Sequence, residues 1–273
     1  MSIKNEDFHY FRVMNTNLHV ALLQSHLAWE NPVQNRAAFT QKINSISQKV
    51  DLIILPEMFT TGFTMNAIEV AEKMGEDTLQ WLEKMAKSAD CAIVGSIIIE
   101  EKGNYYNRLV FMLPDGTYEV YDKHQLFTLA KEQEVFTAGQ KDVIIEYKGW
   151  RIKPLICYDL RFPVWARNTS GYDVLLYVAS WPKLRIDAWD ALLKARAIEN
   201  MCYCIGVNRV GLDGKGYEYN GHSGVYDVLG NSVLEENPIE REAILYVTLD
   251  MSHVKKTRNK LPFLDDKDDF KLI

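Results

Sequence analysis

The chain has 273 residues, of which 47% are hydrophobic, and its formal net charge is −6 at pH 7. This length supports a well-buried core, and we expect one domain over 1–273, with a leader at 1–16 and a tail at 259–273. The lysines and arginines form no basic patch, which argues against a nucleic-acid partner. Four cysteines are too few for a disulfide scaffold. We expect a cytoplasmic protein with no membrane partner, because neither a secretory signal nor a bilayer-spanning run is present.

Apolar runs alternate with helical patterns in the first half of the chain. In chain order, the patterns predict a strand at 18–23, a helix at 32–50, a strand at 51–55, a helix at 77–89 and a strand at 91–99. The helix at 32–50 should turn Ala37, Ala38, Ile43 and Ile46 toward the core. Two further strands, at 107–113 and 118–121, flank Pro114-Asp115-Gly116, which is typical of a hairpin turn.

Strands dominate the second half. The patterns predict strands at 152–157, 174–178, 202–208, 223–227 and 244–249, and a helix at 189–199. Several of these runs are almost continuously apolar, which is typical of sheets buried on both faces. We therefore expect an α/β fold in which two sheets pack face to face with helices outside.

Three reactive side chains follow predicted strands. Glu57 follows DLIILP, Lys123 follows YEVYD, and Cys157 closes IKPLIC. Because ligands of α/β sheets gather beyond the carboxyl ends of strands, these side chains could converge in one cleft. Taken singly, each also fits a simpler role: a capping or surface carboxylate, a solvated ammonium, and a small core cysteine.

Other catalytic patterns fit less well. Gly221-His222-Ser223-Gly224 is one residue short of a nucleophile elbow, and no phosphate-binding glycine loop occurs. The six histidines lack metal-binding spacing, so we expect no metal and no other cofactor. His124 could pair with a cysteine, but we rank it below Glu57 as the base.

The three segments together resemble the nitrilase superfamily, also called the carbon–nitrogen hydrolases. The resemblance is carried by LPEMFTTGF, YDKHQLF and ICYDLRFP, and it extends from about Leu18 to about Phe263. The segments ASWP, ARAIEN and NRVG are most similar to those of the omega-amidases, in particular the bacterial YafV-like branch.

This resemblance implies an αββα sandwich, a homodimer, and hydrolysis of the terminal amide of 2-oxo acids such as 2-oxoglutaramate and 2-oxosuccinamate. The alternatives are an N-carbamoyl amino acid hydrolase or an aliphatic amidase of the same superfamily. A nitrile-cleaving enzyme and a scaffold without activity rank lower.

The resemblance also assigns site residues. Glu57, Lys123 and Cys157 would form a catalytic triad, with a second glutamate at Glu132 or, failing that, at Glu134. A free thiol has a pKa of about 8.5, so Cys157 needs a base, for which Glu57 is suited. Lys123 and the backbone N–H of Tyr158 would stabilise the oxyanion. Further substrate contacts are expected from Phe63, Phe127, Tyr158, Arg161, Trp181 and Lys183, where the cations would bind a carboxylate.

Overall fold

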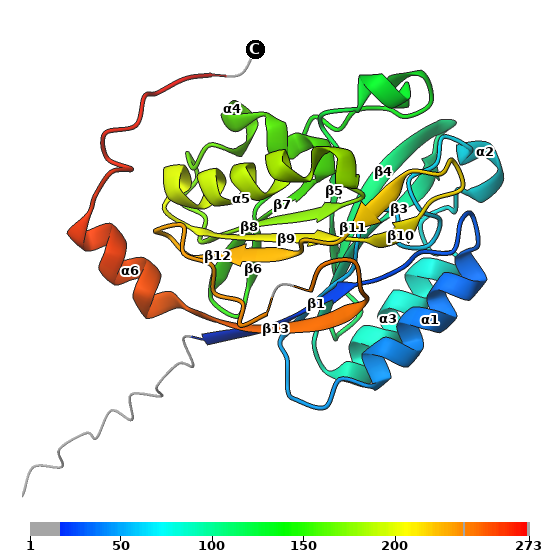
Figure 1. The fold of residues 1–273 in the computed structure, drawn as a ribbon, viewed down its shortest axis with the longest axis horizontal. Helices are drawn as coiled ribbons and strands as arrows, with labels where there is room; N and C mark the ends of the chain where they lie inside the picture. Colours follow the sequence, from blue (N-terminus) through cyan, green and yellow to red (C-terminus); the bar gives the residue numbers. More distant parts are fainter. Residues whose placement is uncertain (1–16, 237, 272–273) are drawn as a thin grey trace, which may run out of the picture.

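The computed structural model describes residues 17–236 and 238–271, and two β-sheets pack face to face in it (Figure 1). The expected leader at 1–16 lies outside the described residues. Helices cover the outer faces of both sheets, so the predicted αββα sandwich is confirmed. No helix in the described ranges is both long and apolar enough to cross a bilayer.

The first sheet has six strands in the order β13-β1-β2-β3-β4-β5. Its central pairs, β1 with β2 and β2 with β3, are parallel, whereas the outer pairs are antiparallel. The predicted hairpin at Pro114-Asp115-Gly116 joins β4 to β5. In chain order the strands are β1 (Asn17–Gln24), β2 (Leu52–Ile54), β3 (Ala92–Glu101), β4 (Asn104–Met112), β5 (Tyr118–Asp122) and β13 (Ala243–Asp250).

The second sheet has five strands in the order β12-β9-β8-β7-β6, again with parallel central pairs and antiparallel edges. A separate two-stranded hairpin, β10 with β11, follows β9. The strands of this half are β6 (Ile145–Tyr147), β7 (Trp150–Ile156), β8 (Val174–Ala179), β9 (Tyr203–Asn208), β10 (Val210–Leu212), β11 (Glu218–Asn220) and β12 (Gly224–Tyr226).

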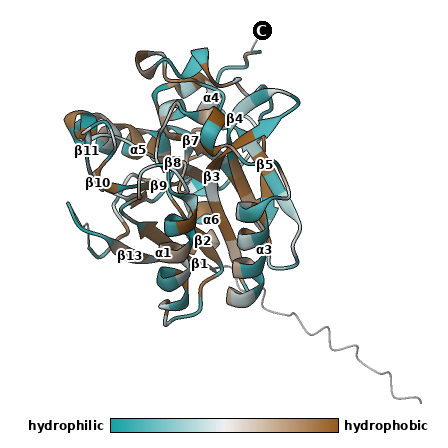
Figure 2. Cartoon of the chain, turned by 90° about the vertical axis from the view of Figure 1, so that its right-hand side faces the viewer, coloured by the Kyte–Doolittle hydropathy of each residue, from teal (hydrophilic) through white to brown (hydrophobic). Residues whose placement is uncertain are grey.

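Helices α1 and α3 cover the six-stranded sheet, and α5 covers the five-stranded one (Figure 1). Strand β1 shows how the layers form, because alternate side chains point to opposite faces. Val20 packs into the core that includes both sheets, whereas Ala21 packs toward α1 and α3. In Figure 2 the strands are largely brown and the outward sides of these helices teal. The helices are α1 (Pro32–Asn44), α2 (Ala67–Val70), α3 (Asp77–Ala89), α4 (Pro163–Ala166), α5 (Ile186–Asn200) and α6 (Met251–Lys260).

The predicted helix at 32–50 is too long, and of its predicted core residues Ile43 is buried and Ile46 packs against the core, whereas Ala37 and Ala38 are not buried. Helix α1 ends at Asn44, where the Ser45 hydroxyl donates to the backbone oxygen of Lys42, a local bond that competes with helix continuation. Ala37 is exposed, and the buried side chains of α1 are Asn35, Phe39 and Ile43. Strands β6, β10 and β11 and helix α6 are absent from the prediction, because three-residue strands and a mostly charged helix carry too little periodicity.

Candidate active site

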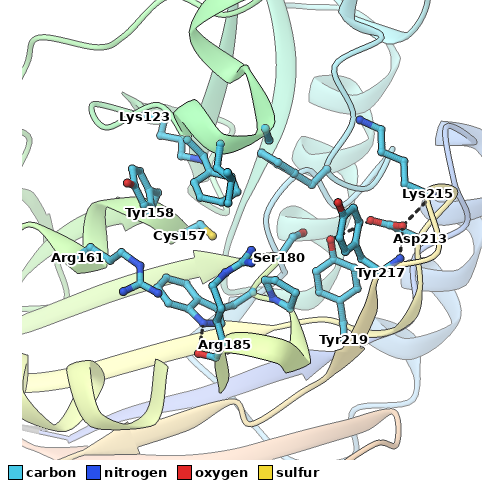
Figure 3. A pocket seen from close by; sticks show the side chains of 16 residues that line it. Lys123, Cys157, Tyr158, Arg161, Ser180, Arg185, Asp213, Lys215, Tyr217 and Tyr219 are labelled. Atoms are coloured by element: carbon cyan, nitrogen blue, oxygen red, sulfur yellow. Dashed lines mark hydrogen bonds between the residues drawn. The ribbon is translucent and has the colours of Figure 1, made fainter. Parts of the chain in front are cut away.

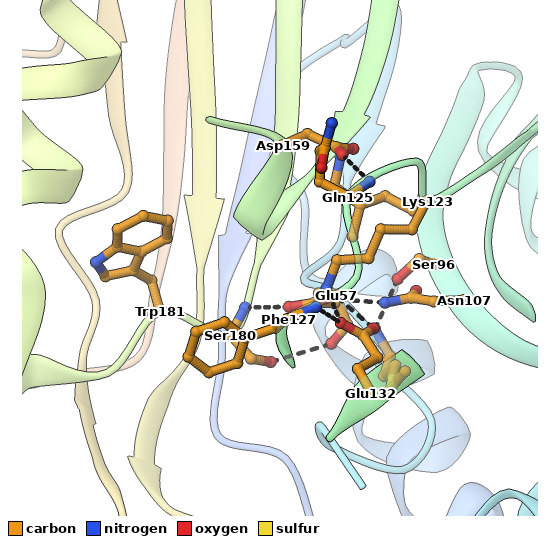
Figure 4. A network of polar contacts seen from close by, with 12 residues as sticks. Glu57, Ser96, Asn107, Lys123, Gln125, Phe127, Glu132, Asp159, Ser180 and Trp181 are labelled. Carbon is orange, nitrogen blue, oxygen red and sulfur yellow. Dashed lines mark hydrogen bonds and ion pairs between the residues drawn. The ribbon is translucent and has the colours of Figure 1, made fainter. Parts of the chain in front are cut away.

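Lys123 lies between two buried glutamates at the junction of the two sheets (Figure 4). Its Nζ donates to Oε1 of Glu57 at 2.9 Å and to both carboxylate oxygens of Glu132 at 2.9 and 3.0 Å. Glu57 follows β2, and Lys123 follows β5. Of the two glutamates considered from the sequence, Glu132 contacts Lys123, whereas the side chain of Glu134 is 57% exposed and pairs with Lys131.

Further donors hold the two carboxylates in place. Asn107 Nδ2 donates to Oε1 of Glu57 at 2.9 Å, and the backbone N–H of Ser180 donates to Oε2 at 2.8 Å. The backbone N–H of Phe127 donates to Oε2 of Glu132 at 2.6 Å. Such donors fix the rotamers of buried carboxylates and offset part of the cost of desolvating their charge.

Burial and neighbouring charges shift the pKa values of Lys123 and Glu132. Burial alone would lower the pKa of Lys123, but Glu132 and Glu57 outweigh it, so the net pKa is raised and the ammonium is retained. Burial raises the pKa of Glu132, against the opposing effect of Lys123. The cluster beneath the cleft therefore combines two buried carboxyl groups with one ammonium.

Cys157 follows β7 and begins the 3-10 helix η3 (Cys157–Arg161). Its φ of 44° lies in the left-handed region, which is unusual for a non-glycine residue and is often found where a reactive side chain is held in a strained turn. Burial and the neighbouring Glu57 raise the pKa of the Cys157 thiol well above its usual range, with Lys123 acting in the opposite direction. The Glu57 carboxylate is therefore close enough to the thiol to influence its protonation.

Asp159 stabilises the turn that carries Cys157. Its Oδ2 accepts from the backbone N–H of Ile156 at 2.9 Å and from the Tyr121 hydroxyl at 2.8 Å. Its Oδ1 accepts from the backbone N–H of Gln125 at 2.8 Å. Asp159 therefore joins the turn that carries Cys157 to the segment that follows Lys123, and it acts as a helix-start contact.

A pocket of about 110 Å³ opens above these residues (Figure 3). Most of the predicted site residues line it, namely Phe63, Lys123, Phe127, Cys157, Tyr158, Arg161 and Trp181. Aromatic rings form much of its wall, with the centroids of Phe127 and Tyr158 4.9 Å apart. Its size suits a compact molecule rather than a polymer.

Two residues considered from the sequence lie elsewhere. Lys183 does not line the pocket; its ammonium pairs with Glu218 at 2.9 Å and Glu240 at 2.7 Å. His124 stacks on Trp165 with ring centroids 3.6 Å apart, and its Nδ1 lies 2.6 Å from the backbone oxygen of Gly139. This arrangement gives no support to a Cys–His pair.

Several lining residues are absent from the sequence-based prediction. Ser180 follows β8, so the strand-end rule that singled out Cys157 could have found it. The others come from short helices and the β10–β11 hairpin, which carry no such signal; the full set is Leu129, Ala130, Ser180, Pro182, Arg185, Asp213, Lys215, Tyr217 and Tyr219.

A carbon-nitrogen hydrolase family model matches residues 19–259. The chain belongs to the carbon-nitrogen hydrolase family. Among related proteins, Omega-amidase YafV of Yersinia enterocolitica is 42% identical over 258 residues, covering 94% of this chain and 100% of that protein. The 2-oxoglutaramate amidase of Bacillus subtilis is 35% identical over 252 residues, covering 90% of this chain and 96% of that protein.

Similarity to solved carbon-nitrogen hydrolases extends to three dimensions. The CN-hydrolase superfamily protein XC1258 of Xanthomonas campestris, whose structure has an arsenic adduct in its active site, superposes with a TM-score of 0.91. It is 38% identical, with 94% of this chain and 99% of that chain covered. The resemblance to the nitrilase superfamily is therefore confirmed.

Proposed function

We propose that this carbon-nitrogen hydrolase is an omega-amidase, which converts 2-oxoglutaramate or 2-oxosuccinamate to the 2-oxo dicarboxylic acid and ammonia. The observation that carries the proposal is the convergence of Cys157, Glu57 and Lys123 at one pocket in a chain 42% identical to an omega-amidase. A thiol, a carboxylate and an ammonium supply the nucleophile, the base and the oxyanion donor that acyl transfer requires.

The first step activates the thiol. Because the pKa of Cys157 is raised, the thiol is neutral at pH 7, and the neighbouring Glu57 carboxylate is the group that accepts its proton. As the proton moves to Glu57, the sulfur attacks the amide carbonyl carbon and the carbonyl oxygen takes up the electron pair. The ammonium of Lys123 and the backbone N–H of Tyr158 stabilise the oxygen anion.

The tetrahedral intermediate then loses ammonia. Glu57 returns its proton to the amide nitrogen, the carbon–nitrogen bond breaks, and a thioester remains on Cys157. A water molecule that gives a proton to Glu57 attacks this thioester, and the carbon–sulfur bond breaks to release the acid and the thiol. Glu132 keeps Lys123 charged and aimed throughout, through its two hydrogen bonds to Nζ.

The substrate assignment rests on the relatives and on the charge of the pocket. Relatives at 35–42% identity bear the names omega-amidase and 2-oxoglutaramate amidase. Arg161, Arg185 and Lys215 line the pocket with a single carboxylate, Asp213, which suits an anionic substrate.

The test is ammonia release from a substrate panel. We expect the highest kcat/KM on 2-oxoglutaramate or 2-oxosuccinamate, and much lower values on glutamine, N-carbamoyl amino acids, butyramide and nitriles. An N-carbamoyl amino acid as the best substrate would transfer the assignment to the hydrolases of that class. Equal rates on butyramide would contradict the requirement for a carboxylate.

We also propose that the chain acts as one catalytic domain and assembles as a homodimer. The first proposal is supported by the site, since Glu57 comes from one sheet and Cys157 from the other. The second is supported by apolar side chains that remain exposed in the C-terminal tail, Phe263 at 57% and Phe270 at 43%.

A further inference from the structure

Two arginines at the pocket differ from the other described arginines in their polar contacts. Within residues 17–236 and 238–271, the guanidinium groups of Arg161 and Arg185 make no hydrogen bond or ion pair with the protein, whereas every other arginine donates at least one. Both exceptions line the pocket (Figure 3). Ten planar N–H donors, about five from each group, are therefore free at one place.

Aromatic walls hold both groups in position. The guanidinium carbon of Arg185 lies 5.4 Å from the ring centroid of Phe127, and that of Arg161 lies 4.8 Å from the ring centroid of Trp181. Trp181 Nε1 also donates to the backbone oxygen of Arg185 at 2.8 Å. Stacking restrains the plane of a guanidinium and leaves its N–H edge open, which suits bidentate binding of a carboxylate.

The ammonium in the cluster beneath the pocket is already paired. Glu57 and Glu132 both pair with the ammonium of Lys123 at the reacting end, so this cation is not free to bind a substrate carboxylate. Of the remaining cations, Lys183 is paired with two glutamates outside the lining, and the side chain of Lys215 is exposed at the rim. The half-buried arginines are thus the cations best placed to bind a substrate carboxylate.

We propose that Arg185 is a specificity-determining residue that binds the substrate's carboxylate bidentately, together with Arg161. The inference rests on the proposed function, because it names the residue that selects the acid end of a 2-oxo acid amide. Arg185 occupies the end of the 3-10 helix η4 (Lys183–Arg185), directly before α5, and its side chain extends from there toward the pocket that contains Cys157 (Figure 3).

The test compares 2-oxoglutaramate with pentanamide, a neutral amide of the same carbon number. Arg185→Met should raise KM for 2-oxoglutaramate by about 10- to 100-fold, the effect of losing a hydrogen-bonded charge, and change kcat much less. The kcat/KM on pentanamide should stay within about threefold. Arg185→Lys should recover only part of the loss, since it keeps the charge without the two-pronged geometry.

Arg241→Met is the matched control, because it removes the same charge from an exposed arginine that pairs with Glu236. It should leave both substrates unaffected. Equal losses of kcat/KM on the two amides in Arg185→Met would overturn the proposal, since the residue would then only shape the pocket. No loss of kcat/KM on either amide would also overturn it, since the residue would then have no role in substrate binding. Circular dichroism and a thermal melt check that each variant is folded.

A binding measurement separates this inference from the proposed function. Calorimetric titration of Cys157→Ala with 2-oxoglutarate, an acid of the same length, reports carboxylate binding without turnover. Adding Arg185→Met should weaken that binding at least about tenfold. If the wild type releases no ammonia from 2-oxoglutaramate, the proposed function fails, yet this titration still decides the role of Arg185: unchanged affinity overturns it.

Discussion

The Nζ atom of Lys123 lies 2.9 Å from Oε1 of Glu57 and 2.9 Å from Oε2 of Glu132, with all three side chains buried. One ammonium therefore pairs with two buried carboxyl groups at the same time. Lys123 can therefore contribute both to the stability of the fold and to catalysis, so experiments must distinguish the two roles.

Lys123→Met should lower kcat at least about a hundredfold, as the loss of an oxyanion donor does. It should also reduce the free energy of unfolding by roughly 3–5 kcal/mol, because the substitution leaves Glu57 and Glu132 facing each other without a counter-charge. Ammonia release and urea unfolding at pH 7.5 measure the two effects. Lys123→Arg should not restore kcat, since the larger planar group cannot occupy the same position.

The double variant Lys123→Met/Glu132→Gln separates these effects. Removing one carboxylate should recover most of the lost stability, because the repulsion disappears, but should not recover kcat. A double variant that regains near-normal turnover would mean that Lys123 has only a structural role.

Cys157→Ala should abolish ammonia release and leave the fold intact, because the thiol is the nucleophile in the proposed mechanism. Cys91→Ala is the control: Cys91 is also buried but packs between the six-stranded sheet and its helices. It should retain activity with a modest loss of stability from the small cavity. Substantial turnover in Cys157→Ala, measured after removal of contaminating amidases, would exclude the thioester route.

Asp159 should leave a signature in the pH dependence of stability. Burial raises the pKa of this carboxyl to about 6, from an ordinary value of 3.8. Between these pH values the folded state binds more protons than the unfolded state, so stability falls as the pH rises from about 4 to 6. The difference in unfolding free energy between wild type and Asp159→Asn should follow this slope, on the order of 2–3 kcal/mol, and level off above pH 6. Parallel curves across the range would argue against the raised pKa.

Lys183→Met should weaken turnover of 2-oxoglutaramate less than Arg161→Met does. Both cations were candidates from the sequence, but Lys183 is neutralised by Glu218 and Glu240, whereas Arg161 lines the pocket without a partner. Paired KM measurements on the two variants decide the order. The reverse order would indicate that Lys183 exchanges its glutamates for the substrate.

The sequence predicts most of the sheet framework because apolar runs report burial directly. The strand at 174–178 and the helix at 77–89 coincide closely with β8 and α3. Cys157 could be placed at the end of a strand for the same reason. The role suggested for Glu132, by contrast, rests on family resemblance, since a glutamate in a charged segment carries no local signal of burial.

Sequence patterns do not predict which cations enter the pocket. Lys183 and Arg185 are two residues apart in the same short helix, and composition cannot tell which one turns inward. Tertiary contacts determine which side chain enters the pocket. Glutamates from β11 and from the segment after β12 pair with Lys183 outside the pocket, whereas the guanidinium of Arg185 packs over the ring of Phe127. Long-range contacts of this kind leave no periodicity in the chain.

Deletion of the residues after Pro262 should weaken a homodimer. Beyond α6 the tail runs away from the sandwich (Figure 1), and the side chains of Phe263 and Phe270 are 57% and 43% exposed. Covering such side chains on a second copy removes apolar surface from water, at roughly 25 cal/mol per Å². Sedimentation velocity at micromolar concentration should show a dimer for the full chain and a larger monomer fraction for the truncated one.

Phe263→Ser/Phe270→Ser should reproduce the effect without shortening the chain. A monomeric full-length protein would refute the dimer, and a truncated chain that remains fully dimeric would place the interface elsewhere.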